Sequence, residues 1–190
     1  MTCRMCLASN NHSAPISVAT RVGIALGSNL GSNLGNRLCN IKAARDMLGK
    51  LMPADAQLIQ APIYQSAPLD CPPDSPDFLN TVVEILYTGL PHELLKQTQK
   101  IESSLGRDRI YQKNAPRPID LDILYFGNQS LNDEVLTIPH PELTRRRFVL
   151  EPLVAIRPDL VLPGDSMIIA EHLQHLDSGE VPLSLVKVDW

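Results

Sequence analysis

The stretch "PRPIDLDILYFG", residues 116–127, decides the fold because it is the most strand-like segment of the chain. Two acidic residues, Asp120 and Asp122, interrupt its hydrophobic pattern one residue apart. Because side chains alternate along a strand, both carboxylates are expected to project from the same face. The other face would carry Ile119, Leu121, Ile123 and Tyr125. The pattern predicts a strand whose apolar face packs against helices while its acidic face borders a cleft.

Two carboxylates on one strand face suit a divalent cation. They lie roughly 7 Å apart at the backbone and can converge on one cation or on a pair of cations. Mg²⁺ favours such a site, because it takes few carboxylates and completes its octahedron with waters and phosphate oxygens. The alternative is a sheet whose second face is simply solvated, which is the more common meaning of an isolated Asp-x-Asp.

Arginines are clustered on both sides of the paired acids, although the chain as a whole is net acidic. They are Arg107, Arg109 and Arg117 upstream and Arg145, Arg146 and Arg147 downstream. A guanidinium binds phosphate in a planar fork. Arginine beside a carboxylate-held metal ion is typical of phosphoryl transfer, where positioning and charge neutralisation supply most of the catalysis. At least one arginine of "TRRRF" is expected instead on a solvated helix face.

Length and composition are those of a globular protein. The chain has 190 residues, 44% of them hydrophobic and 20% charged, which is enough for one sizeable core. A net charge of −4 disfavours general nucleic-acid binding. No apolar run approaches the ~20 residues of a membrane helix. We therefore expect a cytoplasmic monomer with small-molecule partners and neither nucleic acid nor membrane.

The first twenty residues are expected to form a disordered extension, and residues 21–190 a single domain. Cys3 and Cys6 form an isolated C-x-x-C, for which reduced thiols are favoured over a zinc site. The segment lacks the apolar core of a secretory signal, while its composition of Arg and Ser without acids leaves a transit peptide open.

The hydrophobic periodicity predicts an α+β sandwich with helices on one face of a mostly antiparallel sheet. Strands are expected at residues 21–28, 56–66, 78–88, 116–127 and 134–141. Helices are expected at residues 35–52, 91–105, 141–156 and 167–176. Two loops, the proline-rich 67–77 and the basic 106–117, separate them and are long enough to be functional. The order is β-α-β-β-α-β with a C-terminal addition.

Five phrases carry a family resemblance, in the order "ALGSNLG", "PDFLNTVVE", "QKIESSLGR", "PRPIDLDILYFG" and "IPHPELTRRRFVLEPL". Across residues 21–176 the chain resembles the 6-hydroxymethyl-7,8-dihydropterin pyrophosphokinases of folate biosynthesis. The resemblance implies a ferredoxin-like fold. It also implies transfer of the β,γ-pyrophosphoryl group of ATP to the hydroxymethyl oxygen of the pterin, with release of AMP.

The same resemblance implies roles for individual residues. Asp120 and Asp122 match the aspartates that bind two Mg²⁺ ions, and Arg107 and Arg117 match basic residues of the catalytic loop. The positions that match the nucleotide site, with ATP as co-substrate, are Gln99, Glu102, Ile123, His140 and Arg146. The positions that match the pterin site are Ser66, Ala67, Leu69, Phe78, Asn80 and Phe148. The two phenylalanines would sandwich the pterin ring, and the carboxamide of Asn80 would read its amide-like edge.

Several of these residues have a plain structural alternative. Phe78 and Phe148 would serve equally well as core residues on periodicity alone. Glu102 would be a solvent-facing helix residue, and His140 the cap of a turn. The chain also departs from the family, which commonly has Trp-Gly where Asn114 and Ala115 stand. Lys113 is the nearest candidate for another family lysine.

Two other function classes fit parts of the pattern. Nucleotidyl transfer or phosphate-ester hydrolysis also uses paired aspartates with Mg²⁺. A ferredoxin-like RNA-binding module would display aromatic residues on its sheet. Here the central strand displays acids, which repel phosphates unless a metal ion is present.

Overall fold

The computed structural model describes residues 18–190 apart from 33, 70, 108–114, 178 and 180–181. Its main sheet has the strand order β5-β1-β4-β3-β8, and every paired strand in it is antiparallel. These strands are β1 (Thr20–Ser28), β3 (Ile63–Ser66), β4 (Phe78–Tyr87), β5 (Asp120–Phe126) and β8 (Ser184–Lys187). A short strand, β2 (Ile59–Gln60), also pairs with β4. The predicted α+β class with an antiparallel sheet is confirmed.

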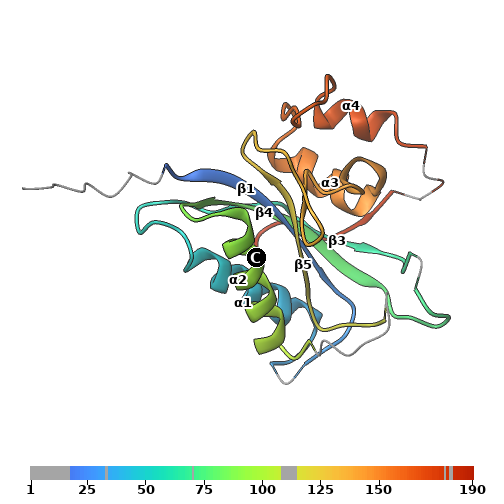
Figure 1. Cartoon of the computed structure of the whole chain (residues 1–190). Coiled ribbons are helices and arrows are strands. Elements are labelled where there is room, and N and C mark those ends of the chain that lie inside the picture. The colour runs from blue at the N-terminus through green and yellow to red at the C-terminus, as the bar shows by residue number, and fades with distance from the viewer. Residues whose placement is uncertain (1–17, 33, 70, 108–114, 178, 180–181) are drawn as a thin grey trace, which may run out of the picture.

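Helices cover both faces of this sheet, which corrects the prediction of helices on one face only (Figure 1). The helices α1 (Arg37–Gly49) and α2 (Pro91–Ser104) lie on one face. On the other face lie α3 (Arg147–Ile156) and α4 (Ile169–Gln174). The molecule therefore has three layers, and each face of the sheet has its own hydrophobic cluster.

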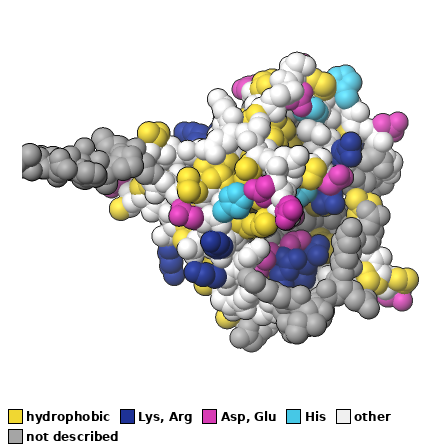
Figure 2. All heavy atoms as spheres, viewed as in Figure 1, with side chains coloured by type: hydrophobic (Ala, Val, Ile, Leu, Met, Phe, Trp, Pro, Cys, Tyr) yellow, Lys and Arg dark blue, Asp and Glu magenta, His cyan; other side chains and the backbone are white. Residues whose placement is uncertain are grey.

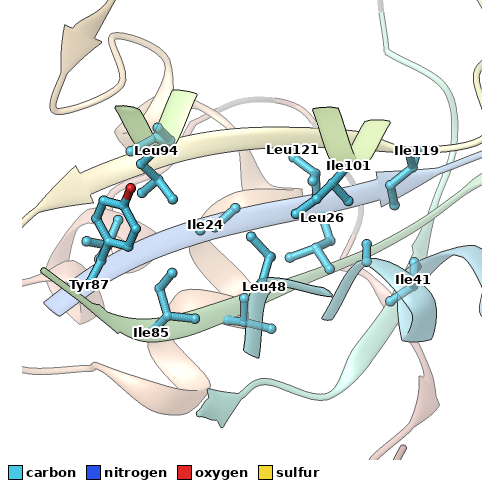
Figure 3. Close-up of a cluster of buried hydrophobic side chains, with 14 of the residues drawn as sticks. Ile24, Leu26, Ile41, Leu48, Ile85, Tyr87, Leu94, Ile101, Ile119 and Leu121 are labelled. Carbon is cyan, nitrogen blue, oxygen red and sulfur yellow. The ribbon is translucent and has the colours of Figure 1, made fainter. Parts of the chain in front are cut away.

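The cluster under α1 and α2 is built from the expected periodicities. Ile24 and Leu26 alternate on β1, while Ile41 and Leu48 lie seven residues apart on one side of α1 (Figure 3). Leu94 of α2 points to the same cluster and is fully buried. Burying each such side chain contributes about 1.5–3 kcal/mol.

The predicted helix over residues 141–156 is broken in two. A 3₁₀ turn, η1 (Leu143–Arg145), precedes α3, and Arg146 between them is extended with φ −117° and ψ 115°. The strand predicted at 134–141 is reduced to β7 (Thr137–Ile138), which pairs with β6 (Leu131–Asn132) in a separate two-stranded sheet.

A β-bulge in β5 changes the predicted facing of Tyr125. Ile24 pairs with Ile123 and Gly23 pairs with Tyr125, so Leu124 is an extra residue on β5. Tyr125 is therefore turned to the α3 face, where it joins Leu124 in the second cluster. Strict alternation had placed it with Ile123, which is wrong because sequence alone does not reveal the bulge.

The α3 face also contains a buried carboxylate that joins three strands and a helix end. Glu84 of β4 is 1% exposed and accepts hydrogen bonds from Arg21 of β1 and from Arg157 after α3. The Tyr125 hydroxyl donates to the same carboxylate over 2.6 Å. Burial raises the pKa of Tyr125, and the bond to Glu84 raises it further. The phenol therefore remains a donor at neutral pH.

The C-terminal strand β8 was not predicted. It pairs with β3 and extends the sheet. Beyond it, the indole Nε1 of Trp190 donates to the Ala61 carbonyl over 2.8 Å, and the Arg45 guanidinium lies 4.9 Å from the indole centroid. At the other end, β1 begins at Thr20, and the rest of the expected extension lies largely outside the described residues.

Within the part of the chain that the structure describes, no helix is both long and apolar enough to cross a membrane.

Candidate active site

A pocket of about 690 Å³, measured with its open side, lies on the α3 face of the sheet. Its floor is formed where β5, β1 and β4 run side by side, and its walls come from the chain after β3 and the start of α3. The lining residues are Ala25, Leu26, Gly27, Ser66, Ala67, Leu69, Cys71, Phe78, Asn80, Thr81, Arg117, Asp120, Asp122, Arg146 and Phe148.

The strand register places chemically different groups on the two sides of this floor. Gly27 on the central strand pairs with Asp120 of β5 on one side and with Asn80 of β4 on the other. Two residues along β1, Ala25 pairs in the same way with Asp122. Both aspartates line the pocket, as the alternation along the strand predicts. The floor thus has an acidic edge and an amide edge, with small residues between them.

Arginines hold the Asp120 carboxylate from two directions. The Arg117 Nη2 lies 2.9 Å from Asp120 Oδ2, and Arg107 pairs with the other carboxylate oxygen. Arg107 also pairs with Glu102, whose carboxylate accepts the Leu121 backbone N–H over 2.8 Å. Glu102 is therefore not the solvent-facing residue that the helix pattern allowed. It joins α2 to the acidic edge of β5.

Asp122 has a different environment from Asp120. Among the described residues it makes no ion pair, although it is one residue away from a carboxylate with two. Burial raises the pKa of Asp122 to about 7, and the nearby charges of Asp120 and Glu102 add to the rise. Arg117 and Arg146 oppose that rise. A cation at this position would favour the ionised carboxylate.

These residues fit a magnesium ion of the kind that the sequence predicts. No group of three or more His, Cys, Asp or Glu ligands surrounds a metal position within the described residues. Mg²⁺ does not need one, since it is usually bound by one or two carboxylates together with waters and substrate phosphates. Two pocket-lining carboxylates, one of them without an ion pair to a described residue, and neighbouring arginines match that requirement.

Basic and acidic side chains also lie together on the surface of this protein. Figure 2 shows dark blue Lys and Arg side chains in contact with magenta Asp and Glu side chains on the viewed face. On this face the mixed patches differ from the broad basic surface that a nucleic-acid-binding protein needs.

The opposite end of the pocket contains two phenylalanine rings and a buried amide. Phe78 belongs to neither hydrophobic cluster, and Phe148 only borders the second one, so both rings are available to the pocket. Asn80 is 5% exposed, and its Nδ2 donates to the Ser66 hydroxyl over 2.8 Å. No described residue donates to its Oδ1, which leaves an acceptor for a ligand. The guanidinium of Arg117 lies 5.8 Å from the Phe78 ring centroid.

Ten of the fifteen site residues predicted from the sequence line this pocket, and five do not. The ten are Ser66, Ala67, Leu69, Phe78, Asn80, Arg117, Asp120, Asp122, Arg146 and Phe148. Arg107 and Glu102 lie behind the acidic edge and contact it through Asp120 and Leu121. Gln99 lies on α2.

Ile123 and His140 do not line this pocket. The side chain of Ile123 is 4% exposed and belongs to the core under α1 and α2, so only its backbone remains for a ligand. His140 accepts the Glu142 backbone N–H at its Nδ1 over 3.2 Å, which is the turn-capping alternative. Burial lowers the pKa of His140, and Arg146 lowers it further. Lys113 and Asn114 lie outside the described residues.

Five lining residues were missed by the sequence reasoning: Ala25, Leu26, Gly27, Cys71 and Thr81. Gly27 stands in the quoted phrase "ALGSNLG", but its position between the acids and Asn80 depends on the pairing of three strands. Sequence periodicity gives the face of a strand and does not give its neighbours.

The sequence of this chain is similar to those of known proteins. The family model for 7,8-dihydro-6-hydroxymethylpterin-pyrophosphokinase matches residues 24–158. A 2-amino-4-hydroxy-6-hydroxymethyldihydropteridine pyrophosphokinase of Haemophilus influenzae is 41% identical over 121 residues, which are 64% of this chain and 74% of that protein. The folic acid synthesis protein fol1 of Pneumocystis carinii is 40% identical over 114 residues, which are 60% of this chain and 15% of that larger protein.

The fold is shared with solved structures. A wild-type HPPK-DHPS of Plasmodium falciparum matches with a TM-score of 0.62 at 13% identity, over 82% of this chain and 44% of that one. The complex of the same protein with pteroate gives the same values. At this identity the likeness shows the fold alone, whereas the family model covers most of the chain. The chain belongs to the 7,8-dihydro-6-hydroxymethylpterin-pyrophosphokinase family.

Proposed function

We propose that this chain transfers the β,γ-pyrophosphoryl group of ATP to the hydroxymethyl oxygen of 6-hydroxymethyl-7,8-dihydropterin. The new bond joins that oxygen to the β-phosphorus, the bond from the β-phosphorus to the α–β bridging oxygen breaks, and AMP leaves. The observation that supports this most is the composition of a single pocket. Asp120 and Asp122 line one side of it, and Phe78, Asn80 and Phe148 line another.

The pterin is assigned to the amide edge of the pocket. Phe78 and Phe148 would contact the two faces of its ring, and Asn80 would accept from its amide-like edge through the unoccupied Oδ1. Because Nδ2 is bonded to Ser66, the amide has a fixed orientation before the ligand arrives. A preorganised polar group loses little entropy on binding.

The triphosphate is assigned to the acidic edge. Asp120 and Asp122 would hold Mg²⁺, which when bound neutralises charge on the phosphate oxygens. Arg117 and Arg107 lie next to Asp120 and would bind phosphate oxygens once the ATP enters. Their contribution is to stabilise negative charge on the bridging oxygen as AMP leaves.

The hydroxyl proton needs an acceptor near the pocket floor. Asp122 lines the pocket without an ion pair to any described residue, whereas Asp120 is engaged by two arginines. Asp122 is therefore the carboxylate in a position to receive the proton. Water has to be excluded from both substrates, since hydrolysis of ATP is the side reaction. The long loops at 66–77 and 106–117 would serve this purpose; residue 70 and residues 108–114 of them lie outside the described part of the chain.

The test is product analysis with a matched variant. The protein is incubated with ATP, Mg²⁺ and the reduced pterin, and nucleotides are separated by chromatography. We expect AMP without ADP, strictly dependent on the pterin, and a loss of at least 1,000-fold in Asp122→Asn. Asp55→Asn changes an exposed aspartate and should retain full activity. Pterin-independent release of phosphate would instead indicate a phosphate-ester hydrolase, and the absence of any product a binding module.

A further inference from the structure

The central strand β1 carries two glycines on the face that borders the pocket. Gly23 and Gly27 alternate with Ile24 and Leu26, whose side chains point to the helices on the opposite face (Figure 3). Neither glycine has a positive φ, so the backbone at both positions would accept an L side chain. Glycine inside a strand weakens it and often marks a place where something approaches closely. Both glycines are therefore expected to leave room for a group that lies directly above the strand.

The space above Gly23 is filled by the protein itself. A Cβ added there would fall 2.1 Å from Cε1 of Tyr125 and 2.7 Å from Cζ of the same ring. The phenol ring of Tyr125 thus rests directly on the bare backbone of the strand. This contact explains why residue 23 has no side chain.

The space above Gly27 is not filled in this way. A Cβ there would meet Asn80 Oδ1 at 3.2 Å, the Phe78 ring carbon Cδ1 at 3.7 Å and the Asp120 Cβ at 3.9 Å. All three neighbours line the pocket together with Gly27. The vacancy therefore opens into the pocket, between the amide edge and the acidic edge.

We infer that Gly27 is a specificity-determining position whose missing side chain leaves room beside Asn80 for the edge of the planar heteroaromatic ring of the substrate. This inference rests on the proposed function for the identity of the ring. Tyr125 over Gly23 shows, on the same face of the same strand, that a ring can occupy the space that a missing side chain leaves. Asn80 supplies the second observation, because it is 95% buried with an acceptor atom that no described residue uses.

A methyl group at residue 27 would interfere with the ring in two ways. It would occupy the space between Phe78 and Asp120 that the edge of the ring needs. It would also press on Asn80 Oδ1 at a separation of 3.2 Å, which is tighter than ordinary van der Waals contact. The amide cannot move freely, since its Nδ2 is bonded to Ser66. The variant would thus lose both room for the ring and the amide that reads its edge.

The experiment measures binding, so that it does not depend on turnover. Gly27→Ala, Gly49→Ala and the unchanged chain are titrated with 6-hydroxymethyl-7,8-dihydropterin in the presence of Mg²⁺ and a non-hydrolysable ATP analogue. The analogue alone is titrated in parallel, and thermal unfolding is recorded. Gly49→Ala is the matched control, because a Cβ at that helix position meets nothing within 4 Å.

We expect Gly27→Ala to weaken pterin binding at least tenfold while the affinity for the ATP analogue changes less than twofold and the unfolding temperature is retained. Gly49→Ala should leave both affinities unchanged. Pterin binding within twofold of the unchanged chain would overturn the inference, and so would an equal loss for both ligands. A protein that binds the pterin with this pattern but forms no AMP would leave the inference intact and overturn the proposed function.

Discussion

At the scale of single residues, the two ends of the pocket differ in the chemistry of their side chains. The acidic end contains one carboxylate that is bound by two arginines and another whose pKa is raised to about 7 by burial and by neighbouring acids. The amide end contains Asn80, which is buried with a fixed orientation. The paired acids were predicted because acids inside a strand stand out against a hydrophobic pattern, whereas Asn80 was expected from the family resemblance. Gly27 was not predicted, since only strand pairing gives its neighbours.

Asn80→Asp provides the first residue-scale prediction. The carboxylate has the same shape but loses the donor that bonds Ser66 and adds a charge to a buried site. An unsatisfied or charged buried group costs about 1–3 kcal/mol, which corresponds to a 5–150-fold loss of pterin affinity. Calorimetric titration with the pterin measures this loss of affinity. The exposed Asn132→Asp is the control, and equal affinities of both variants would refute the role of Asn80.

At the scale of elements, one asparagine connects the two segments that border the pocket. The side-chain Oδ1 of Asn29 accepts the Arg117 backbone N–H over 2.7 Å, and its Nδ2 donates to the Pro76 carbonyl over 3.4 Å. Asn29 is 2% exposed and follows β1 directly. It thereby fixes the position from which Arg117 reaches Asp120.

Asn29→Ala should therefore slow the reaction more than it weakens the binding of the pterin. We expect kcat to fall at least tenfold, because Arg117 loses its backbone anchor, together with a loss of about 1–3 kcal/mol in the free energy of unfolding. Steady-state kinetics and urea denaturation measure the two effects. Asn128→Ala, at an exposed turn, is the control. A normal kcat in a destabilised variant would show that Asn29 is only structural.

The elements themselves show which features a sequence can predict. The strands β1, β4 and β5 and the helices α1 and α2 follow clear periodicities and were predicted within a few residues. Two features were not accessible: the bulge at Leu124 breaks the alternation of β5, and β8 is held by pairing with β3 although its side chains are exposed. Both depend on contacts between distant segments, which local patterns do not record.

At the scale of the whole molecule, the sheet is covered on both faces, and the site lies on the less covered one (Figure 1). The α1 and α2 side forms the larger hydrophobic cluster, so the other face can keep polar groups at the pocket. The Glu84 carboxylate holds this second face together, since it joins β1, β4, β5 and the end of α3 through Arg21, Tyr125 and Arg157.

Glu84→Gln should lower the stability of the whole chain. Removing one partner of a buried ion pair costs about 3–5 kcal/mol, because the remaining charges lose their compensation. Two arginines here are partly exposed, so the lower end of that range is expected. Chemical denaturation measures the change, with the exposed Glu134→Gln as control. A loss below about 1 kcal/mol would show that Glu84 does not join the layers.

The central claim is that one pocket brings a pterin alcohol and a magnesium-bound triphosphate together. Phosphorus NMR of a mixture of the protein, ATP, Mg²⁺ and 6-hydroxymethyl-7,8-dihydropterin tests it most directly. The account predicts that AMP and a pterin diphosphate appear at equal rates, while no ADP forms. Formation of ADP with a pterin monophosphate, or consumption of ATP at the same rate without the pterin, would contradict it.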